Sequence, residues 1–367
     1  MQATLTVTTS ADLQQALERL SAARFLALDT EFMRESTYFP KLCLIQAATP
    51  DFCALIDPLA MPDLQQLWQL LARRECIKVL HAARQDYEVI SLASPSGPPG
   101  PVFDTQVAAA LLGYPAQIGY GPLVSERLGI TLAKDHTRAD WSRRPLSEEQ
   151  LRYAADDVRY LAPLYLDLRD ALEAAGRLEW LREETCELEQ PELHRTDPRT
   201  AWQRLKGLDR LQPEQRAAAK LLAQWRETTA MKHDKPRGWI LADDALREIA
   251  ERLPASIQDL ERIRTLPAGV IRRRGAELVA LVEQGCGKAD AEAPAILPQR
   301  PEPQQLSRVT RLMSFVRAQA QELRISPELL ATRRDIERLV FSGRAERLMK
   351  GWRREVIGER LAALAAA

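Results

Sequence analysis

The stretch Phe25-Leu26-Ala27-Leu28-Asp29-Thr30-Glu31-Phe32 predicts an apolar β-strand that is interrupted by two carboxylates. Side chains two residues apart lie on the same face of a strand, so we expect Asp29 and Glu31 to project together. In a central, buried strand two like charges repel each other and lose hydration unless a cation compensates them. Oxygen ligands of this kind suit Mg²⁺ or Mn²⁺. On its own, the pattern also fits a strand end that reaches solvent.

Around this strand, short apolar runs alternate with helical patterns over residues 1–175, which predicts an α/β domain. Further strands are expected at 41–49, 52–57 and 77–82, and helices at 63–74, 83–93 and 105–113. A long helix is predicted from Ser147, where Ser-Glu-Glu-Gln forms a capping box, with a kink or break at Pro163.

Two further patterns place acids near the ends of predicted elements. Asp86 lies in the first turn of the helix that follows Val79-Leu80-His81, where an acid also suits the helix dipole; His81 itself is interpreted as a structural histidine. Tyr153 and Asp157 are four residues apart and share one helix face, whereas Asp156 is turned away from it. A tyrosine packed at a helix surface, with Asp157 in solvent, is the alternative interpretation of the last pair.

From Thr196 onward the chain predicts only amphipathic helices. Two rear segments share a plan of helix, Pro-marked loop and helix, and an alignment that places Pro236 opposite Pro327 and Ile249 opposite Val340 predicts a tandem repeat. At 367 residues the chain should divide into several domains. We expect domains at 1–190, 196–285 and 304–367, with a linker at 286–303 that is rich in Pro, Ala, Gln and Gly.

Charge is uneven along the chain although the net charge is zero. Residues 1–195 carry 19 Lys and Arg against 28 Asp and Glu, a net charge of −9, whereas 196–290 carry 18 against 14, or +4, and 303–367 carry 13 against 7, or +6. An acidic front and a basic rear are expected if the front binds divalent cations and the rear contacts a polyanion, although two ordinary solvated surfaces explain the same counts.

Composition excludes several classes of protein. No apolar run approaches the length of a membrane-spanning helix and the start of the chain lacks a signal-peptide pattern, so we expect a cytoplasmic protein without membrane contact. The five cysteines form no CxxC pair, which argues against a disulfide framework or a thiolate zinc site and predicts small buried side chains. No P-loop motif is present, which excludes a helicase or another NTPase of that type.

Taken together, the Asp-x-Glu strand, Asp86 and the Tyr-x-x-x-Asp helix resemble the DEDD exonuclease superfamily, in its tyrosine-bearing subgroup. The resemblance to ribonuclease D spans nearly all of residues 20–170 and also rests on the stretches 25–32, 38–46, 103–106 and 140–146. The rear segments resemble the paired HRDC domains of that family, the first closely and the second loosely. The expected fold is therefore an α/β ribonuclease H-like exonuclease domain followed by all-α HRDC-type domains.

The resemblance implies a 3′→5′ exoribonuclease that works with two divalent ions and releases nucleoside 5′-monophosphates, acting as a monomer on tRNA precursors with 3′ extensions. Asp29 would bridge the ions, Glu31 and Asp157 would complete the site on the side of the nucleophile, and Asp86 would hold the other ion. Tyr153 would orient the attacking water, because a phenol of pKa near 10 is a poor base at pH 7.

Basic residues in two places are candidates for contacts to RNA phosphates, and solvated surfaces explain them equally well. They are Lys134, Arg138, Arg143 and Arg144 beside the catalytic motifs, and Arg272, Arg273 and Arg274 at a predicted helix start. Two other functions stay open: a 3′→5′ DNA exonuclease, since the catalytic set does not recognise the sugar, and a non-catalytic RNA-binding scaffold. A scaffold has no need for clustered acids, which argues against the second.

Overall fold

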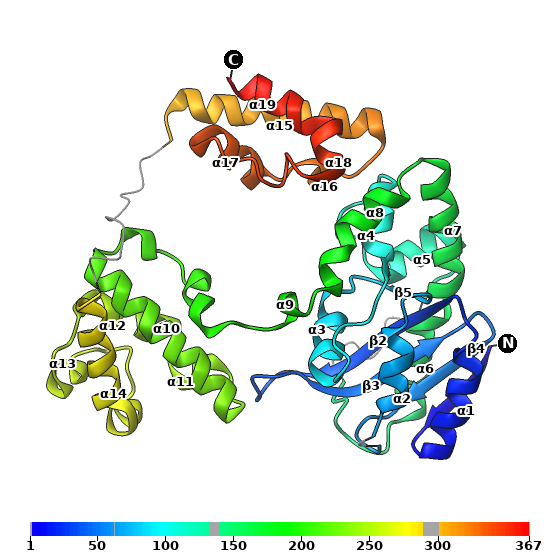
Figure 1. The fold of residues 1–367 in the computed structure, drawn as a ribbon, viewed down its shortest axis with the longest axis horizontal. Helices are drawn as coiled ribbons and strands as arrows, with labels where there is room; N and C mark the ends of the chain where they lie inside the picture. Colours follow the sequence, from blue (N-terminus) through cyan, green and yellow to red (C-terminus); the bar gives the residue numbers. More distant parts are fainter. Residues whose placement is uncertain (1, 62, 133–138, 289–300, 367) are drawn as a thin grey trace. The chain divides into compact units, whose positions relative to one another are not determined.

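The computed structural model describes residues 2–61, 63–132, 139–288 and 301–366 (Figure 1). Contacts group the chain into two compact units. The first, called the sheet unit here, comprises Met1–Met33, Leu42–His194 and Pro301–Ala367. The second, called the helical unit, comprises Arg34–Lys41 and Arg195–Arg300.

A six-stranded mixed sheet forms the centre of the sheet unit, with strand order β1-β4-β3-β2-β5-β6. The strands are β1 (Ala3–Val7), β2 (Phe25–Met33), β3 (Lys41–Ala48), β4 (Phe52–Ile56), β5 (Ile77–Leu80) and β6 (Val102–Asp104). β2 pairs in parallel with β5 and β5 with β6, whereas β3 is antiparallel to β4. The strand that carries the two acids therefore has neighbours on both sides, as the sequence predicted.

Helices cover both faces of the sheet, and the alternation of side chains along β2 divides the core between them. Leu26 and Leu28 pack with helices α1 (Ser10–Leu20), α2 (Gln65–Ala72) and α3 (Arg84–Ala93). Ala27 packs on the opposite face, in a core shared with α4 (Thr105–Leu111), α5 (Tyr120–Leu128), α6 (Glu148–Arg159) and α7 (Leu161–Ala174). By the same alternation, Asp29 and Glu31 lie on the α6 face and Thr30 lies on the α3 face.

The predicted long helix is divided into α6 and α7 at Tyr160, three residues before Pro163. Pro163 itself lies in the first turn of α7, where its missing N–H costs nothing. Helices α8 (Leu178–Thr185) and α9 (Pro191–His194) follow, joined by the 3₁₀ turn Cys186–Glu189.

The rear half contains only helices among its described residues, as predicted. In the helical unit these are η2 (Pro198–Arg204), η3 (Leu208–Arg210), α10 (Pro213–His233), α11 (Arg237–Ile240), α12 (Asp243–Arg252), α13 (Ile257–Glu261) and α14 (Ala268–Cys286). In the sheet unit they are α15 (Pro303–Leu323), α16 (Pro327–Leu330), α17 (Arg333–Ser342), α18 (Gly351–Arg353), the π-helical turn Arg354–Gly358 and α19 (Glu359–Ala366).

The tandem repeat is present, but our alignment of it is wrong by one residue. Helices α10, α11 and α12 have 21, 4 and 10 residues, and α15, α16 and α17 have the same lengths. α10 begins at Pro213 and α15 at Pro303, so equivalent residues are 90 apart, not 91. The error arose from pairing two prolines that are not equivalent: Pro236 is the N-cap of α11, whereas Pro327 is the first residue of α16.

Helices α15 to α19 pack on the part of the sheet unit that precedes residue 195. The indole rings of Trp180 and Trp352 stack with centroids 4.5 Å apart and an interplanar angle of 9°. The guanidinium of Arg353 donates to both carboxylate oxygens of Glu184, and the backbone N–H of Ser326 donates to the carbonyl of Ala110 at 2.8 Å. The four-part division predicted from the sequence stays a prediction, but contacts place 301–366 with the front domain.

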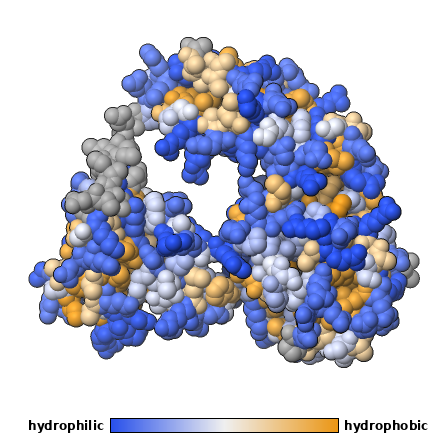
Figure 2. All heavy atoms as spheres, in the orientation of Figure 1, coloured by the Kyte–Doolittle hydropathy of each residue, from blue (hydrophilic) through white to orange (hydrophobic). Residues whose placement is uncertain are grey.

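Two simpler predictions can be compared with the structure. Cys43, Cys53 and Cys76 are buried as expected, and half-buried Cys286 packs against the core of the helical unit. Cys186 is exposed, so the prediction of a buried side chain is wrong for this residue. Within the described ranges, every helix is too short or too polar to cross a membrane. Figure 2 shows a surface on which hydrophilic residues surround separate hydrophobic patches.

Candidate active site

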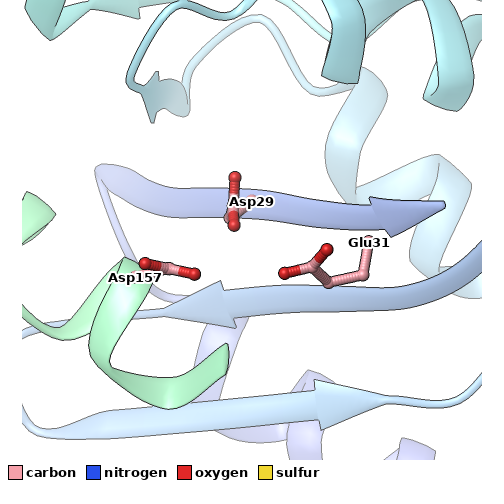
Figure 3. Close-up of side chains that lie close together, drawn as sticks. All are labelled: Asp29, Glu31 and Asp157. Atoms are coloured by element: carbon pink, nitrogen blue, oxygen red, sulfur yellow. The ribbon is translucent and has the colours of Figure 1, made fainter. Parts of the chain in front are cut away.

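Three carboxylates meet beside the centre of the sheet. Asp29 and Glu31 extend from β2 and Asp157 from α6, and one oxygen of each lies within 4.8 Å of the others (Figure 3). The carboxylates of Glu31 and Asp157 point toward each other in this view. All three side chains are partly buried, and within the described part of the chain none of them is in an ion pair.

The start of α6 sets the register of its acids. The Ser147 hydroxyl accepts from the N–H of Gln150, and the Gln150 side chain accepts from the N–H of Ser147. Buried Ala154, Ala155 and Val158 then pack this helix on the sheet. The capping box predicted from the sequence is therefore present.

This register directs Asp157 toward β2 and Asp156 away from it. The Tyr153 side chain hydrogen-bonds with the Asp157 carboxylate, one turn apart on the same helix. Asp156 instead forms an ion pair of 2.5 Å with Arg159. The structure thus brings Tyr153, Asp157 and the β2 acids together and leaves Asp156 out, as the helical spacing predicted.

Asp86 lies next to this group but not within it. It is 8% exposed in the first turn of α3, and its carboxylate accepts a 2.5 Å hydrogen bond from the hydroxyl of Thr30. Thr30 faces α3 because it alternates with Asp29 and Glu31 along β2. The charge of Asp86 is the largest electrostatic contribution to the raised pKa of Asp29, so the two carboxylates are close.

Burial raises the pKa of all four acids, and repulsion by neighbouring carboxylates adds to the effect. The pKa of Glu31 is raised to about 8, with Asp157 and Asp86 as the charged neighbours. That of Asp157 is raised to about 7 and that of Asp86 to about 6, in both cases chiefly by loss of hydration. The pKa of Asp29 is raised well above its ordinary value by burial and by the other three acids. Without a cation, the group therefore holds protons near neutral pH.

These residues fit a divalent metal ion. Oxygen atoms of three acids within 4.8 Å of one another can contact one ion, and hard carboxylate donors suit Mg²⁺ or Mn²⁺ better than softer metals. Protons and a cation compete for the same oxygens, so the raised pKa values are the signature expected of a site that is neutralised by metal.

Two tyrosines border the acids, and only one of them was predicted. Burial, followed by the charges of Asp157, Glu31 and Asp29, raises the pKa of Tyr153 well above its ordinary value. Tyr120 was missed: burial and the charges of Asp157 and Asp29 also raise its pKa well above the usual range, and its hydroxyl donates to the carbonyl of Asp156 at 3.3 Å. No sequence signal pointed to Tyr120, which lies in a separate helix, α5.

The turn between β5 and α3 places Asp86, and Asp104 holds that turn. The Asp104 carboxylate accepts from the backbone N–H groups of Ala82 and Ala83 at 3.0 and 2.9 Å, and Ala82 has a positive φ of 57°. His81 contacts the Thr105 hydroxyl through Nδ1 at 2.9 Å and the Ile118 carbonyl through Nε2 at 3.0 Å. With both ring nitrogens bonded, His81 is a structural residue, as predicted.

The predicted phosphate contacts beside the site have different outcomes. Lys134 and Arg138 lie outside the described residues. The Arg143 side chain is 84% exposed and 3.6 Å from Asp140. Arg144 has a structural role that argues against the prediction for it, because all five of its N–H groups donate within the protein. The acceptors are the Asp57 carboxylate and the backbone carbonyls of Cys43, Trp141 and Arg143.

The three arginines of α14 point to different sides of the helix, because successive residues are rotated about the helix axis. Arg273 and Arg274 line a surface hollow together with Trp239, whereas Arg272 is exposed on another side of the helix and does not line it. Two residues of the run therefore line the hollow, and the phosphate contacts of all three arginines stay predictions.

Comparisons with known proteins agree with this geometry. Residues 4–173 match a family of 3′-5′ exonuclease domains and residues 215–282 match the HRDC domain. Ribonuclease D of Granulibacter bethesdensis is 39% identical and covers 98% of this chain and 91% of its own length; that of Acidiphilium cryptum is 40% identical and covers 96% and 90%. The crystal structure of Escherichia coli RNase D aligns with a TM-score of 0.89 at 34% identity over 100% of this chain and 99% of that one.

The full-length likeness shows that the predicted α/β exonuclease fold with a following HRDC domain is correct and that the front domain is that of a nuclease. With relatives of this identity aligned over nearly the whole chain, the protein belongs to the ribonuclease D family.

Proposed function

We propose that this protein is a metal-dependent exoribonuclease that hydrolyses RNA from its 3′ end with two divalent ions and releases nucleoside 5′-monophosphates. The observation that carries the proposal is the group formed by Asp29, Glu31 and Asp157, with Tyr153 hydrogen-bonded to its helical member. The E. coli relative, described as an exoribonuclease involved in structured RNA processing, supports RNA as the substrate.

The four acids would hold the ions. Asp29 would contact both, Glu31 and Asp157 would complete one site, and Asp86 would serve the other. Bound divalent ions lower the pKa of a coordinated water and neutralise charge on the leaving 3′-oxygen. The protein contributes the placement: the capping box fixes α6, the Asp104 turn fixes α3, and the Thr30 hydroxyl orients the Asp86 carboxylate.

Tyr153 would position the attacking water. Its pKa lies well above the usual range, so at neutral pH the phenol keeps its proton and cannot act as a general base. A hydroxyl that donates to the Asp157 carboxylate still has lone pairs with which to accept a hydrogen bond from water. This orients the nucleophile without proton transfer to the tyrosine.

For the substrate, we propose tRNA precursors with 3′ extensions, bound by a monomer. The nuclease site needs only a 3′ end, whereas the basic rear of the chain, with net charges of +4 and +6 in its two parts, suits a larger polyanion.

The experiment that tests this proposal follows hydrolysis of 5′-labelled single strands with Mg²⁺ or Mn²⁺, comparing a terminal 2′-OH with a terminal 2′-H. We expect stepwise shortening from the 3′ end, 5′-monophosphate products and no activity in excess chelator. Asp29→Asn should be inactive, and Asp156→Asn should serve as the active control because Asp156 pairs with Arg159. Preference for the 2′-H end would identify a DNA exonuclease, and binding without hydrolysis would identify a scaffold.

A further inference from the structure

The helical unit carries an exposed tryptophan beside several basic side chains. Trp239 in α11 is 64% exposed, and it borders a hollow of about 340 Å³. The residues that line this hollow are His233, Lys235, Trp239, Ile240, Val270, Arg273 and Arg274. An adjoining hollow shares His233 and Arg274 with it and adds Lys232 and Lys288. The hollow that Trp239 borders thus combines one indole ring with the cations Lys235, Arg273 and Arg274.

The local structure holds Trp239 in this position. α10 ends at Asp234 in a left-handed conformation, and the Asp234 carboxylate accepts from the N–H groups of Tyr38 and Phe39, both at 3.0 Å. After α11, Leu241 is 2% exposed, and its carbonyl accepts from buried Arg226 at 3.0 Å. The short helix α11 is therefore held in place on both sides, and the folded structure keeps Trp239 exposed.

Helical spacing brings the cations to the ring. Val270, Arg273 and Arg274 lie three and four residues apart on α14 and so share one face. The Lys235 ammonium lies 5.9 Å from the centre of the Trp239 ring. Arg274 is 3.3 Å from Glu277, whereas Arg273 is exposed and makes no ion pair with any residue that the structure describes.

The second copy of the repeat shows how the same segment looks when protein covers it. The residues 90 positions after His233, Lys235 and Trp239 are Leu323, Ile325 and Leu329. All three are apolar members of the core of the sheet unit, or pack against it. Arg177 of the nuclease part donates to the Leu323 carbonyl. In the first copy the corresponding positions are cationic or aromatic and exposed, which is the chemistry of a surface for a charged ligand.

We propose that this surface binds a single-stranded segment of RNA, with one base stacked on Trp239 and the adjoining phosphates contacting Arg273, Arg274 and Lys235. Aromatic stacking beside a basic groove is how single strands are bound without sequence preference. The proposal rests on the function proposed above, since it identifies where the exoribonuclease holds RNA outside its catalytic site.

The test measures binding of a fluorescein-labelled single-stranded 12-mer RNA to the full-length protein in chelator, where hydrolysis cannot occur. Trp239→Ala should weaken binding about 5- to 150-fold, the range for loss of one base stack. Trp239→Phe should retain most of the affinity because it keeps an aromatic face. Against a strand with abasic residues, the wild type and Trp239→Ala should bind equally, since no base is left to stack.

Arg272 supplies a matched control for charge, because it lies on the same helix and is exposed but does not line the hollow. Arg273→Ala should make the log–log salt dependence of binding shallower by about 0.7, the value for one phosphate contact on a single strand. Arg272→Ala should leave this slope unchanged. Equal slopes for the two variants would assign the effect to net charge and overturn the proposal.

Wild-type affinity in Trp239→Ala would likewise overturn it and would leave this surface for a protein partner. The thermal midpoint of each variant shows whether the fold is intact. Failure of the proposed function is detected separately, as absence of hydrolysis by the unaltered protein when Mg²⁺ is added, and does not depend on these variants.

Discussion

Removing the carboxylate of Glu184 should detach helices α15 to α19 from the nuclease part. The side chains of Glu184 and Arg353 are 14% and 7% exposed, and the guanidinium contacts both carboxylate oxygens. The Trp352 indole N–H donates to Glu184 at 2.8 Å, and Arg353 Nε donates to the Leu329 carbonyl at 2.6 Å. Glu184→Ala therefore leaves a buried cation and an indole N–H without their acceptor.

The expected loss of stability is large because the group that is left without a partner, the Arg353 guanidinium, is charged. Removing one partner of a buried ion pair costs about 3–5 kcal/mol, whereas replacing both partners with apolar residues of similar volume is often close to neutral. Glu184→Leu combined with Arg353→Met should therefore be less destabilising than Glu184→Ala alone. Against a total stability of about 5–15 kcal/mol, the single change should release the C-terminal helices well before global unfolding.

Urea unfolding and limited proteolysis measure these outcomes, with Arg354→Ala as the control. Arg354 neighbours Arg353, but its ion pair with Glu359 is 59% and 61% exposed, so its loss should cost less than about 1 kcal/mol. Glu184→Ala should make helices α15 to α19 more susceptible to protease and lower the free energy of unfolding by several times the control value. Equal, small effects of the two changes would refute the packing argument.

Three further predictions concern the acids. Asp29→Asn should reduce RNA hydrolysis to background and, in chelator, raise the thermal midpoint, because it removes a carboxylate that is buried among three others. Tyr153→Phe should slow turnover about 10²–10⁴-fold with near-normal RNA affinity, and unchanged single-turnover rates would return Tyr153 to a packing role. In chelator, the free energy of unfolding should fall as pH rises from about 4 to about 8. The reason is that folded Glu31 (pKa about 8) and folded Asp157 (pKa about 7) retain protons that the unfolded chain has released. Calorimetry in saturating Mg²⁺ should show that this pH dependence is removed.

The sequence predicted those parts of the site that follow from local periodicity. Alternation along a strand placed Asp29 and Glu31 on one face, and helical spacing joined Tyr153 to Asp157 while excluding Asp156. Both arguments need only the geometry of one element. The division of the core also follows from β2, since Leu26 and Leu28 alternate with Ala27.

Contacts between distant segments could not be predicted in this way. The hydrogen bond from Thr30 to Asp86 joins residues 56 apart, and the approach of Tyr120 to the acids depends on how α5 packs. Arg144 is a second example. Its position near catalytic motifs suggested a phosphate contact, but its five N–H donors are used by Asp57 and by backbone carbonyls that are distant in sequence or could not be foreseen. Sequence periodicity shows which side chains share a face of one helix or strand, but it does not show which distant residues they contact.

The docking of 301–366 also changes how the basic rear of the chain should be tested. A truncation near residue 195 removes the +4 and +6 segments together, but it also uncovers the nuclease surface on which Trp352 stacks against Trp180. A lower RNA affinity of such a fragment could then result either from the loss of RNA contacts or from a structural change in the nuclease domain. Point changes in the helical unit avoid this ambiguity, since Trp239 and Arg273 lie on its surface and Arg272 gives the matching control. If the rear of the chain grips RNA, these variants should alter affinity while the packing around Trp352 stays intact.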